Sequence, residues 1–424
     1  MTERDERRRV RGAVGRVAID LSPLRVSRDF RRLWIGLSVS EVGYHFTLVA
    51  TFIQVFELTG SPAAVGLIGL VGLVGIVVGS VAGGTFVDAT DRRVTLLGCQ
   101  IGFMVASGTL FVGALAGEPP IWIVYASVAL ISAVSAVDSS VRHAMTPRLV
   151  GRDLLPSALA LNQVVWNGTA LVGPAIAGVL IERFGLSWAY GFDLASYVGM
   201  FLVALTIGPV PPEAAEYRRA GWGAVLEGFA YLRGRRVLQG TFLADLVAMV
   251  FGMPRALFPI LAVTQFGRGV EVVGLLFAAP AVGALVGAVT AGWVGRVRHQ
   301  GRAVLLAGAA WGAGIAAFGL VGSNLWLALG CLAIAGAADV ISAVFRGTIL
   351  QLAVPDPLRG RLSGINYLVV AGGPRLGDLE AGLVASAFSP TVSVVSGGIL
   401  CILGAAAVAL FVPSLVRYRA EDPA

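Results

Sequence analysis

Residues 62–84 have the sequence PAAVGLIGLVGLVGIVVGSVAGG, an uncharged apolar run in which small residues recur. At about 1.5 Å of rise per residue, a helix of this length crosses the roughly 30 Å hydrocarbon core of a bilayer. The rest of the chain is similar: 56% of its 424 residues are hydrophobic, 13% are charged, and the mean hydropathy is +0.82. Soluble domains carry about 25% charged residues. We therefore expect an all-α integral membrane protein that crosses the bilayer many times.

Eleven further runs of comparable length complete a set of twelve predicted spans, numbered here in chain order. They cover residues 33–56, 62–86, 94–116, 120–141, 158–181, 187–209, 239–263, 272–295, 303–321, 325–346, 364–388 and 391–414. A hydrophilic loop at 211–238, amphipathic enough for a surface helix, separates the first six spans from the last six. We thus predict two six-helix bundles, 33–210 and 239–414, flanked by tails at 1–32 and 415–424.

Arginines indicate the orientation of these spans. All 32 basic residues other than histidine are arginines, and 28 of them fall in the tails and in the loops of one side, against Arg183 and Arg268 on the other. Because cytoplasmic loops carry the excess of positive charge, we expect both termini in the cytoplasm and the chain in a bacterial cell membrane. The N-terminal tail lacks the short apolar core of a cleavable signal peptide. The lipid bilayer accounts for the basic charge, so no nucleic-acid partner is expected.

Motifs for catalysis or ATP hydrolysis are missing from the sequence. It contains no GxxxxGK[ST] phosphate loop, no HExxH and no Cys/His metal spacing, and its three cysteines are far apart. We expect no enzymatic activity, no metal, no cofactor and no ATPase subunit. A transporter of this kind would use the proton gradient as its energy source and would act as a monomer.

The two halves of the chain match each other at a nearly constant offset. Gly66, Gly75, Gly79 and Gly84 recur 208 residues later as Gly274, Gly283, Gly287 and Gly292, and Arg142, Asn162, Gly173 and Gly178 recur 204 residues later as Arg346, Asn366, Gly377 and Gly382. Parallel repeats of this kind build transporters whose substrate path lies between two halves that rock against each other. The glycines equally fit tight static packing of helices.

The end of span 2 (62–86) and the loop after it, GGTFVDATDRR, resemble a signature of the major facilitator superfamily. Gly84, Asp88, Arg92 and Arg93 fall on its matching positions, while Ala89 departs from it. The resemblance implies that Asp88 caps the N-terminus of span 11 (364–388) and that the arginines pair with acids or lipid headgroups, which would latch the cytoplasmic side. A loop charge that only sets the topology is the alternative.

Longer stretches, covering nearly the whole chain after Leu21, resemble the exporter branch of this superfamily, which includes the enterobactin exporter and drug:proton antiporters. The segment GPAIAG is similar to a pattern of exporters in span 5 (158–181), with Gly173, Pro174 and Gly178 matching and Ala177 departing from it. The resemblance implies efflux of a small organic molecule, a siderophore or an amphipathic drug, by proton antiport.

Ionisable side chains within the spans are the candidate functional residues, because each costs on the order of 3 kcal/mol in the bilayer unless it has a partner, water or a proton. Glu41 and His45 lie four residues apart on one face of span 1 (33–56), where they could bind a proton together. A polar pair that only fixes helix packing is the alternative.

Span 11 (364–388) contains the densest group of charges. Arg375, Asp378 and Glu380 follow the sequence Gly-Gly-Pro at 372–374, which predicts a broken helix with a substrate or coupling-ion site at mid-membrane. Arg375 and Asp378, three residues apart, could pair along one face. A purely structural salt bridge is the alternative.

Four more charged residues complete the candidates. Asp193 in span 6 (187–209) and Asp245 in span 7 (239–263) could bind the proton or the substrate. Asp138 and Arg142, four residues apart at the end of span 4 (120–141), could form a gate by pairing with each other or with Arg92.

We therefore predict a secondary active transporter that exports a small organic molecule in exchange for protons by alternating access. An importer or facilitator with the same fold is the nearest alternative. A membrane scaffold that does not transport is another, but it would have no use for so many buried charges.

Overall fold

The computed structural model describes residues 20–211 and 230–419, except for the side chains at 82, 84–89, 356–361, 363, 364 and 367. Within these ranges every regular element is a helix. The predicted surface helix of the central loop lies mostly at 212–229, outside the described residues.

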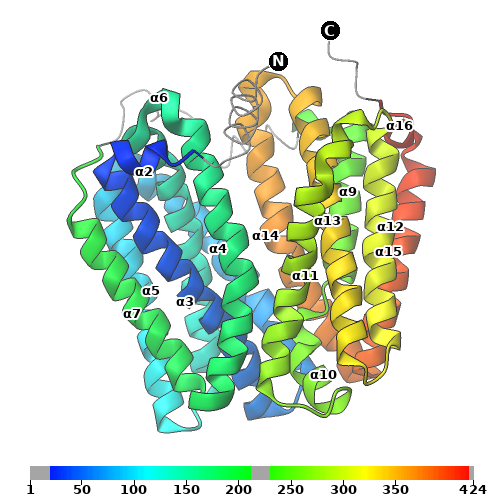
Figure 1. The fold of residues 1–424 in the computed structure, drawn as a ribbon, viewed down its shortest axis with the longest axis horizontal. Coiled ribbons are helices and arrows are strands. Elements are labelled where there is room, and N and C mark those ends of the chain that lie inside the picture. Colours follow the sequence, from blue (N-terminus) through cyan, green and yellow to red (C-terminus); the bar gives the residue numbers. More distant parts are fainter. Residues whose placement is uncertain (1–19, 212–229, 420–424) are drawn as a thin grey trace, which may run out of the picture.

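The N-terminal bundle is built from helices that run back and forth across the molecule (Figure 1). They are α2 (Ser22–Val26), α3 (Arg28–Thr59), α4 (Pro62–Ala89), α5 (Arg92–Ala116), α6 (Ile121–Phe184) and α7 (Leu186–Leu205). α6 contains the predicted spans 4 and 5 and folds back at Gly151, where φ is +75° and ψ is 171°. Glycine adopts this conformation without the steric penalty of a Cβ atom, so one helical segment crosses twice.

The C-terminal bundle repeats this arrangement. Its elements are α9 (Arg236–Phe251), η2 (Pro254–Leu257), α10 (Phe258–Thr264), α11 (Val270–Thr290), η3 (Ala291–Arg296), α12 (Gln300–Leu320), α13 (Leu325–Ala353), α14 (Asp356–Ala387), α15 (Pro390–Phe411) and α16 (Pro413–Val416). In the described chain, nine helical segments are long and apolar enough to cross a membrane, with α6 counted once. The more polar α3 and α14, with 32 residues each, and the second crossing of α6 complete the two six-helix bundles.

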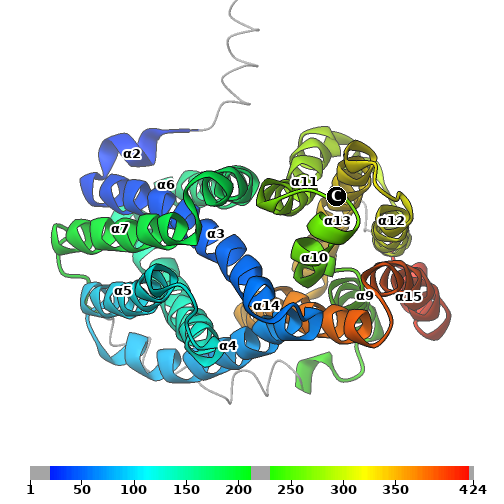
Figure 2. The same cartoon turned by 90° about the horizontal axis from the view of Figure 1, so that it is seen from below.

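Two helix pairs join the bundles: α4 packs on α14, and α6 packs on α11 (Figure 2). Glycines permit both contacts. A Cβ atom at Gly66 would lie 3.1 Å from the Cα of Gly382, and one at Gly274 would lie 2.9 Å from the Cα of Gly178. Because Gly66 corresponds to Gly274 and Gly178 to Gly382 in the sequence repeat, one contact occurs twice around a pseudo-twofold axis.

Side chains reinforce both contacts at the same end of the molecule. Glu182, at the end of α6, accepts a hydrogen bond from the backbone N–H of Val270 (2.8 Å), which begins α11. Ser386, at the end of α14, accepts one from the backbone N–H of Ala63 (2.9 Å), in the first turn of α4. We call this end, opposite α2 and α16, the closed end. The bundles diverge toward α2 and α16 (Figure 1).

The predicted break in span 11 is wrong. α14 continues through Pro374 from Asp356 to Ala387, because it is held between α4 and α9. The break lies in span 7 instead. α9 ends at Phe251, and Pro254, which lacks an N–H, begins the 3-10 turn η2.

Candidate transport site

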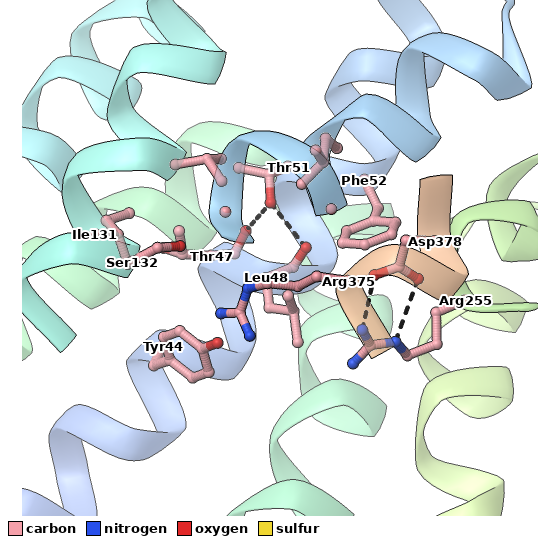
Figure 3. A pocket seen from close by; sticks show the side chains of 14 residues that line it. Tyr44, Thr47, Leu48, Thr51, Phe52, Ile131, Ser132, Arg255, Arg375 and Asp378 are labelled. Atoms are coloured by element: carbon pink, nitrogen blue, oxygen red, sulfur yellow. Dashed lines mark hydrogen bonds and ion pairs between the residues drawn. The ribbon is translucent and has the colours of Figure 1, made fainter. Parts of the chain in front are cut away.

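A cavity of about 300 Å³ lies between the bundles. It is lined by α3, α4, α5, α6 and α7 on one side and by η2 and α14 on the other, and its charged lining residues are Glu41, Asp138, Arg142, Arg255 and Arg375. A smaller cavity of about 80 Å³ adjoins it, shares Tyr44, Arg255 and Arg375, and adds Asp378 (Figure 3). The arrangement places charged groups from both bundles around one space.

On the N-terminal wall, one arginine forms ion pairs with two acidic residues. Arg142 Nη1 lies 3.2 Å from Glu41 Oε1, and its Nε lies 3.1 Å from Asp138 Oδ2. Gln100 Nε2 donates to the other oxygen of Asp138 at 3.4 Å. The structure thus joins Glu41, predicted to bind a proton, to the two residues predicted to form a gate. With both acids ionised, this triad carries a formal charge of −1.

His45 lies one helical turn from Glu41 and lines the same cavity. Its Nδ1 is buried and has no hydrogen-bond partner among the described residues, and its ring meets that of Tyr44 edge-on at 5.5 Å. A Cβ atom at Gly173 would lie 2.6 Å from the Cβ of His45. Gly173, which matches the exporter pattern, therefore lets α6 pack closely against α3 at His45. The ion-pair partner of Glu41 is Arg142 and not His45.

On the C-terminal wall, Arg255 binds Asp378 through two nitrogens. Nη2 lies 2.7 Å from Oδ2, and Nε lies 3.4 Å from Oδ1. The expected pair between Arg375 and Asp378 does not form, because the break before η2 brings Arg255 to this carboxylate in the favourable two-point geometry. Arg375 extends away from Asp378 on the side of Tyr44, as Figure 3 shows, and its Nη1 donates to the carbonyl of Ala371 at 2.7 Å.

The remaining candidates lie outside both described cavities. Asp193 is fully buried in the N-terminal bundle, where Thr47 and Ser107 each donate a hydroxyl to its Oδ2 at 2.6 Å. Asp245 pairs with Arg346 inside the C-terminal bundle at 2.9 Å. The side chain of Glu380, on α14, makes no hydrogen bond or ion pair with any described residue. Their roles stay predictions.

Comparison with known proteins assigns the chain to a family. A model described as "transmembrane secretion effector" matches residues 18–422. The chain belongs to this family of major facilitator transporters. It is similar to the enterobactin exporter EntS of Citrobacter koseri, with 27% identity over 413 residues that cover 96% of this chain and 97% of the relative.

Solved structures of other transporters share the fold of this major facilitator. The nucleoside transporter NupG superposes with a TM-score of 0.71 at 13% identity, covering 92% of this chain and 99% of NupG. A bacterial homologue of the human lysosomal transporter Spinster, in an inward-facing and unoccupied conformation, gives 0.70 at 15% identity, covering 93% and 98%. The chain is thus a multi-pass membrane transporter homologous to an exporter.

The superfamily signature is described only in part. The side chain of Asp88 lies outside the described part of the structure, so the predicted latch, to which Gly84 also belongs, stays a prediction. Arg93 donates to the carbonyls of Ala204 (Nε, 3.2 Å) and Leu205 (Nη2, 2.6 Å). These carbonyls belong to the last turn of α7, where the regular helical hydrogen bonds end, and the N–H of Ile207 also donates to the carbonyl of Ala204 at 3.3 Å. In this transporter, Arg93 therefore ties the loop to the N-terminal bundle.

Sequence reasoning missed the two hydrogen bonds at the closed end of the transporter. Glu182 and Ser386 are 204 residues apart, the same offset as in the repeat, and each caps the first turn of a helix in the other bundle. The offset was visible for glycines and arginines. If the same offset is applied to the polar residues at the ends of span 5 and span 11, it indicates Glu182 and Ser386 as an equivalent pair.

Proposed function

We propose that this transporter exports a small organic molecule from the bacterial cytoplasm in exchange for protons. The observation that carries the proposal is the triad of Glu41, Asp138 and Arg142 on the cavity wall. Two carboxylates facing one guanidinium leave one negative charge unmatched in a medium of low dielectric constant. A proton neutralises it, and so does a cationic group of a substrate. Because a bound proton and a bound cationic group exclude each other at the triad, this arrangement supports the exchange of protons for substrate.

The closed end supports the order of steps in such a cycle. If both termini are cytoplasmic, as the arginine distribution predicts, the bundles diverge toward the cytoplasm and the cavity loads from that side. Substrate would enter as the triad releases its proton inward. After the bundles rock, substrate would leave outward and a proton would bind from outside. The relatives named as enterobactin exporters support a siderophore or an amphipathic drug as the cargo.

Everted membrane vesicles, energised to an acidic interior and loaded with a pH-sensitive dye, test this proposal. We expect ethidium and norfloxacin, which carry a cationic group, to release protons from vesicles that contain the wild-type transporter. Glu41→Gln should abolish the release, because it removes the unmatched charge. Glu57→Gln is the matched control, since Glu57 is exposed on the same helix and far along it from the triad.

Two results would count against proton-coupled export. Proton release by Glu41→Gln at the wild-type rate would exclude this residue as the coupling group. Downhill movement of labelled substrate in both directions, without any pH change, would show a facilitator with the same fold.

A further inference from the structure

The two walls of the inter-bundle cavity carry opposite formal charges. On the N-terminal wall, two acids share Arg142, which leaves −1. On the C-terminal wall, Arg255 and Asp378 neutralise each other, and Arg375 adds +1. No described carboxylate lies within ion-pair distance of Arg375. The cavity is thus close to neutral overall, yet it has a negative side and a positive side.

Arg375 has donors left for a ligand. Of its five N–H groups, one binds the carbonyl of Ala371 in the preceding turn of α14. The side chain is half-buried and lines both the larger and the smaller cavity. Gly72 leaves space beside it, because a Cβ atom there would lie 2.9 Å from Arg375 Nε. A planar guanidinium in this setting suits a carboxylate or a similar planar acid.

Aromatic side chains lie between the charged walls. Tyr44, Phe103, Trp166 and Tyr197 line the larger cavity, and Figure 3 shows the Tyr44 ring on the same side as the Arg375 guanidinium. Rings of this kind provide apolar surface for a flat organic body. A ligand that satisfies all three features has an acid at one end, a cation at the other and an aromatic body between them.

We propose that the cavity selects an amphoteric aromatic molecule, whose acidic group binds Arg375 and whose cationic group faces Glu41 and Asp138. This inference rests on the proposed exchange mechanism, because the cationic group is what would replace the proton at the triad. Arg375 contributes selectivity for the acidic end and takes no part in proton binding. A purely cationic or purely anionic substrate would use only one of the two walls.

Three probes with one skeleton separate these possibilities. Norfloxacin carries a carboxylate and an ammonium group, its methyl ester keeps only the ammonium, and N-acetylnorfloxacin keeps only the carboxylate. We expect the full-length transporter in lipid nanodiscs to bind norfloxacin about tenfold more tightly than either derivative, the difference that one charged hydrogen-bonded contact supplies. Equal affinity for norfloxacin and either derivative, or no binding of all three, would overturn the proposal.

Variants of Arg375 locate the acidic subsite. Arg375→Gln should weaken binding of norfloxacin and N-acetylnorfloxacin by about tenfold while the ester keeps its affinity, and Arg375→Lys should recover part of the loss. Arg268→Gln removes one exposed arginine outside the cavity and is the matched control. An equal loss for all three probes in Arg375→Gln would mean a general packing defect and would overturn the assignment.

The proton-release assay with the same probes separates this inference from the proposed function. Release by the methyl ester at least as strong as by norfloxacin would leave proton-coupled export standing and remove the acidic subsite. Charge-dependent binding of norfloxacin without proton release would support the subsite and contradict antiport.

Discussion

Glu41 and Asp245 occupy equivalent positions in the two bundles, 204 residues apart, and each pairs with the arginine of the repeat, Arg142 or Arg346. Each arginine also reaches a second acid on its own helix, Asp138 at 3.1 Å and Asp339 at 3.6 Å. Only the N-terminal triad lines the described cavities. The same ion-pair arrangement therefore faces the inter-bundle cavity in one bundle and the bundle interior in the other.

The pair of Asp245 and Arg346 should matter for stability. Asp245→Asn removes the acid at 2.9 Å and leaves the buried guanidinium with Asp339 at 3.6 Å. Removing the closer partner of a buried ion pair costs about 3 kcal/mol, because the guanidinium keeps only the longer of its carboxylate contacts, the one with Asp339. We expect a lower Tm for the detergent-solubilised variant. A wild-type Tm for the single variant would contradict this reasoning.

The hydrogen bonds at the closed end should bias the transporter toward that closed state. Glu182→Ala or Ser386→Ala removes a cap that links the two bundles. Each cap is worth about 1 kcal/mol, so either change should increase the population open at this end about fivefold. Electron-spin distances between labels at positions 183 and 268, one in each bundle, would report the opening.

Ser61→Ala is the matched control for this experiment. Ser61 also accepts a hydrogen bond in the first turn of α4, from Ala64, but it belongs to the same bundle. It should leave the distance distribution unchanged. If all three variants widened the distribution equally, helix fraying and not the link between bundles would be the cause.

The glycine contacts between bundles should be intolerant of a methyl group. Gly178→Ala would place a Cβ atom 2.9 Å from the Cα of Gly274, so that α6 and α11 must separate. We expect reduced transport together with a shift away from the closed conformation, measured by flux and by the same spin labels. Gly330→Ala is the control, because no described atom of another element lies within 4 Å of the place that its Cβ would occupy.

Asp20 should attach α2 to the fold-back of α6 in a pH-dependent way. Hydrogen bonds from the Ser22 hydroxyl and N–H and from the Ser157 hydroxyl lower the pKa of Asp20 from its usual value. Since the folded pKa is depressed, the attachment is fully present above the unfolded pKa of about 3.9 and is lost as the pH falls through the folded value. After correction for the pH dependence of intrinsic amide exchange, the protection of residues 20–26 against hydrogen exchange should therefore be constant from about pH 8 to pH 5.

Asp20→Asn tests the same contact at neutral pH. Asparagine accepts a hydrogen bond less strongly than a carboxylate, so exchange in α2 should rise relative to wild type. Ser157→Ala should have a smaller effect, because it removes one of three donors. Exchange that is unchanged in both variants would show that packing against α6 alone holds α2.

The fold followed from the sequence because hydrophobic length is a local property of each span, and a membrane leaves few alternatives to a helix. The position of the helix break did not follow from the sequence. Gly-Gly-Pro at 372–374 and Gly252 with Pro254 are similar local signals, and packing of α14 between α4 and α9 decides which helix remains continuous. Local pattern cannot encode that difference.

Partners within the candidate site were equally hard to predict. The sequence identifies Glu41, Arg375 and Asp378 as charges inside spans and Arg142 as a charge at the end of span 4. Their pairing depends on side chains 101 and 123 residues apart, since Glu41 meets Arg142 and Asp378 meets Arg255. The rule that charges three or four residues apart can pair identified Asp138 with Arg142 but assigned Arg375 to Asp378 wrongly.

The two hydrogen bonds at the closed end differ in chemistry: Glu182 is an exposed carboxylate, whereas Ser386 is a neutral hydroxyl. Dissolved salt screens the attraction between an exposed carboxylate and the positive end of α11 and leaves a neutral acceptor almost unaffected. The contact between α6 and α11 therefore depends on the salt concentration of the surrounding medium, whereas the contact between α4 and α14 does not. A transporter built from two similar halves thus acquires an environmental sensitivity on one flank only.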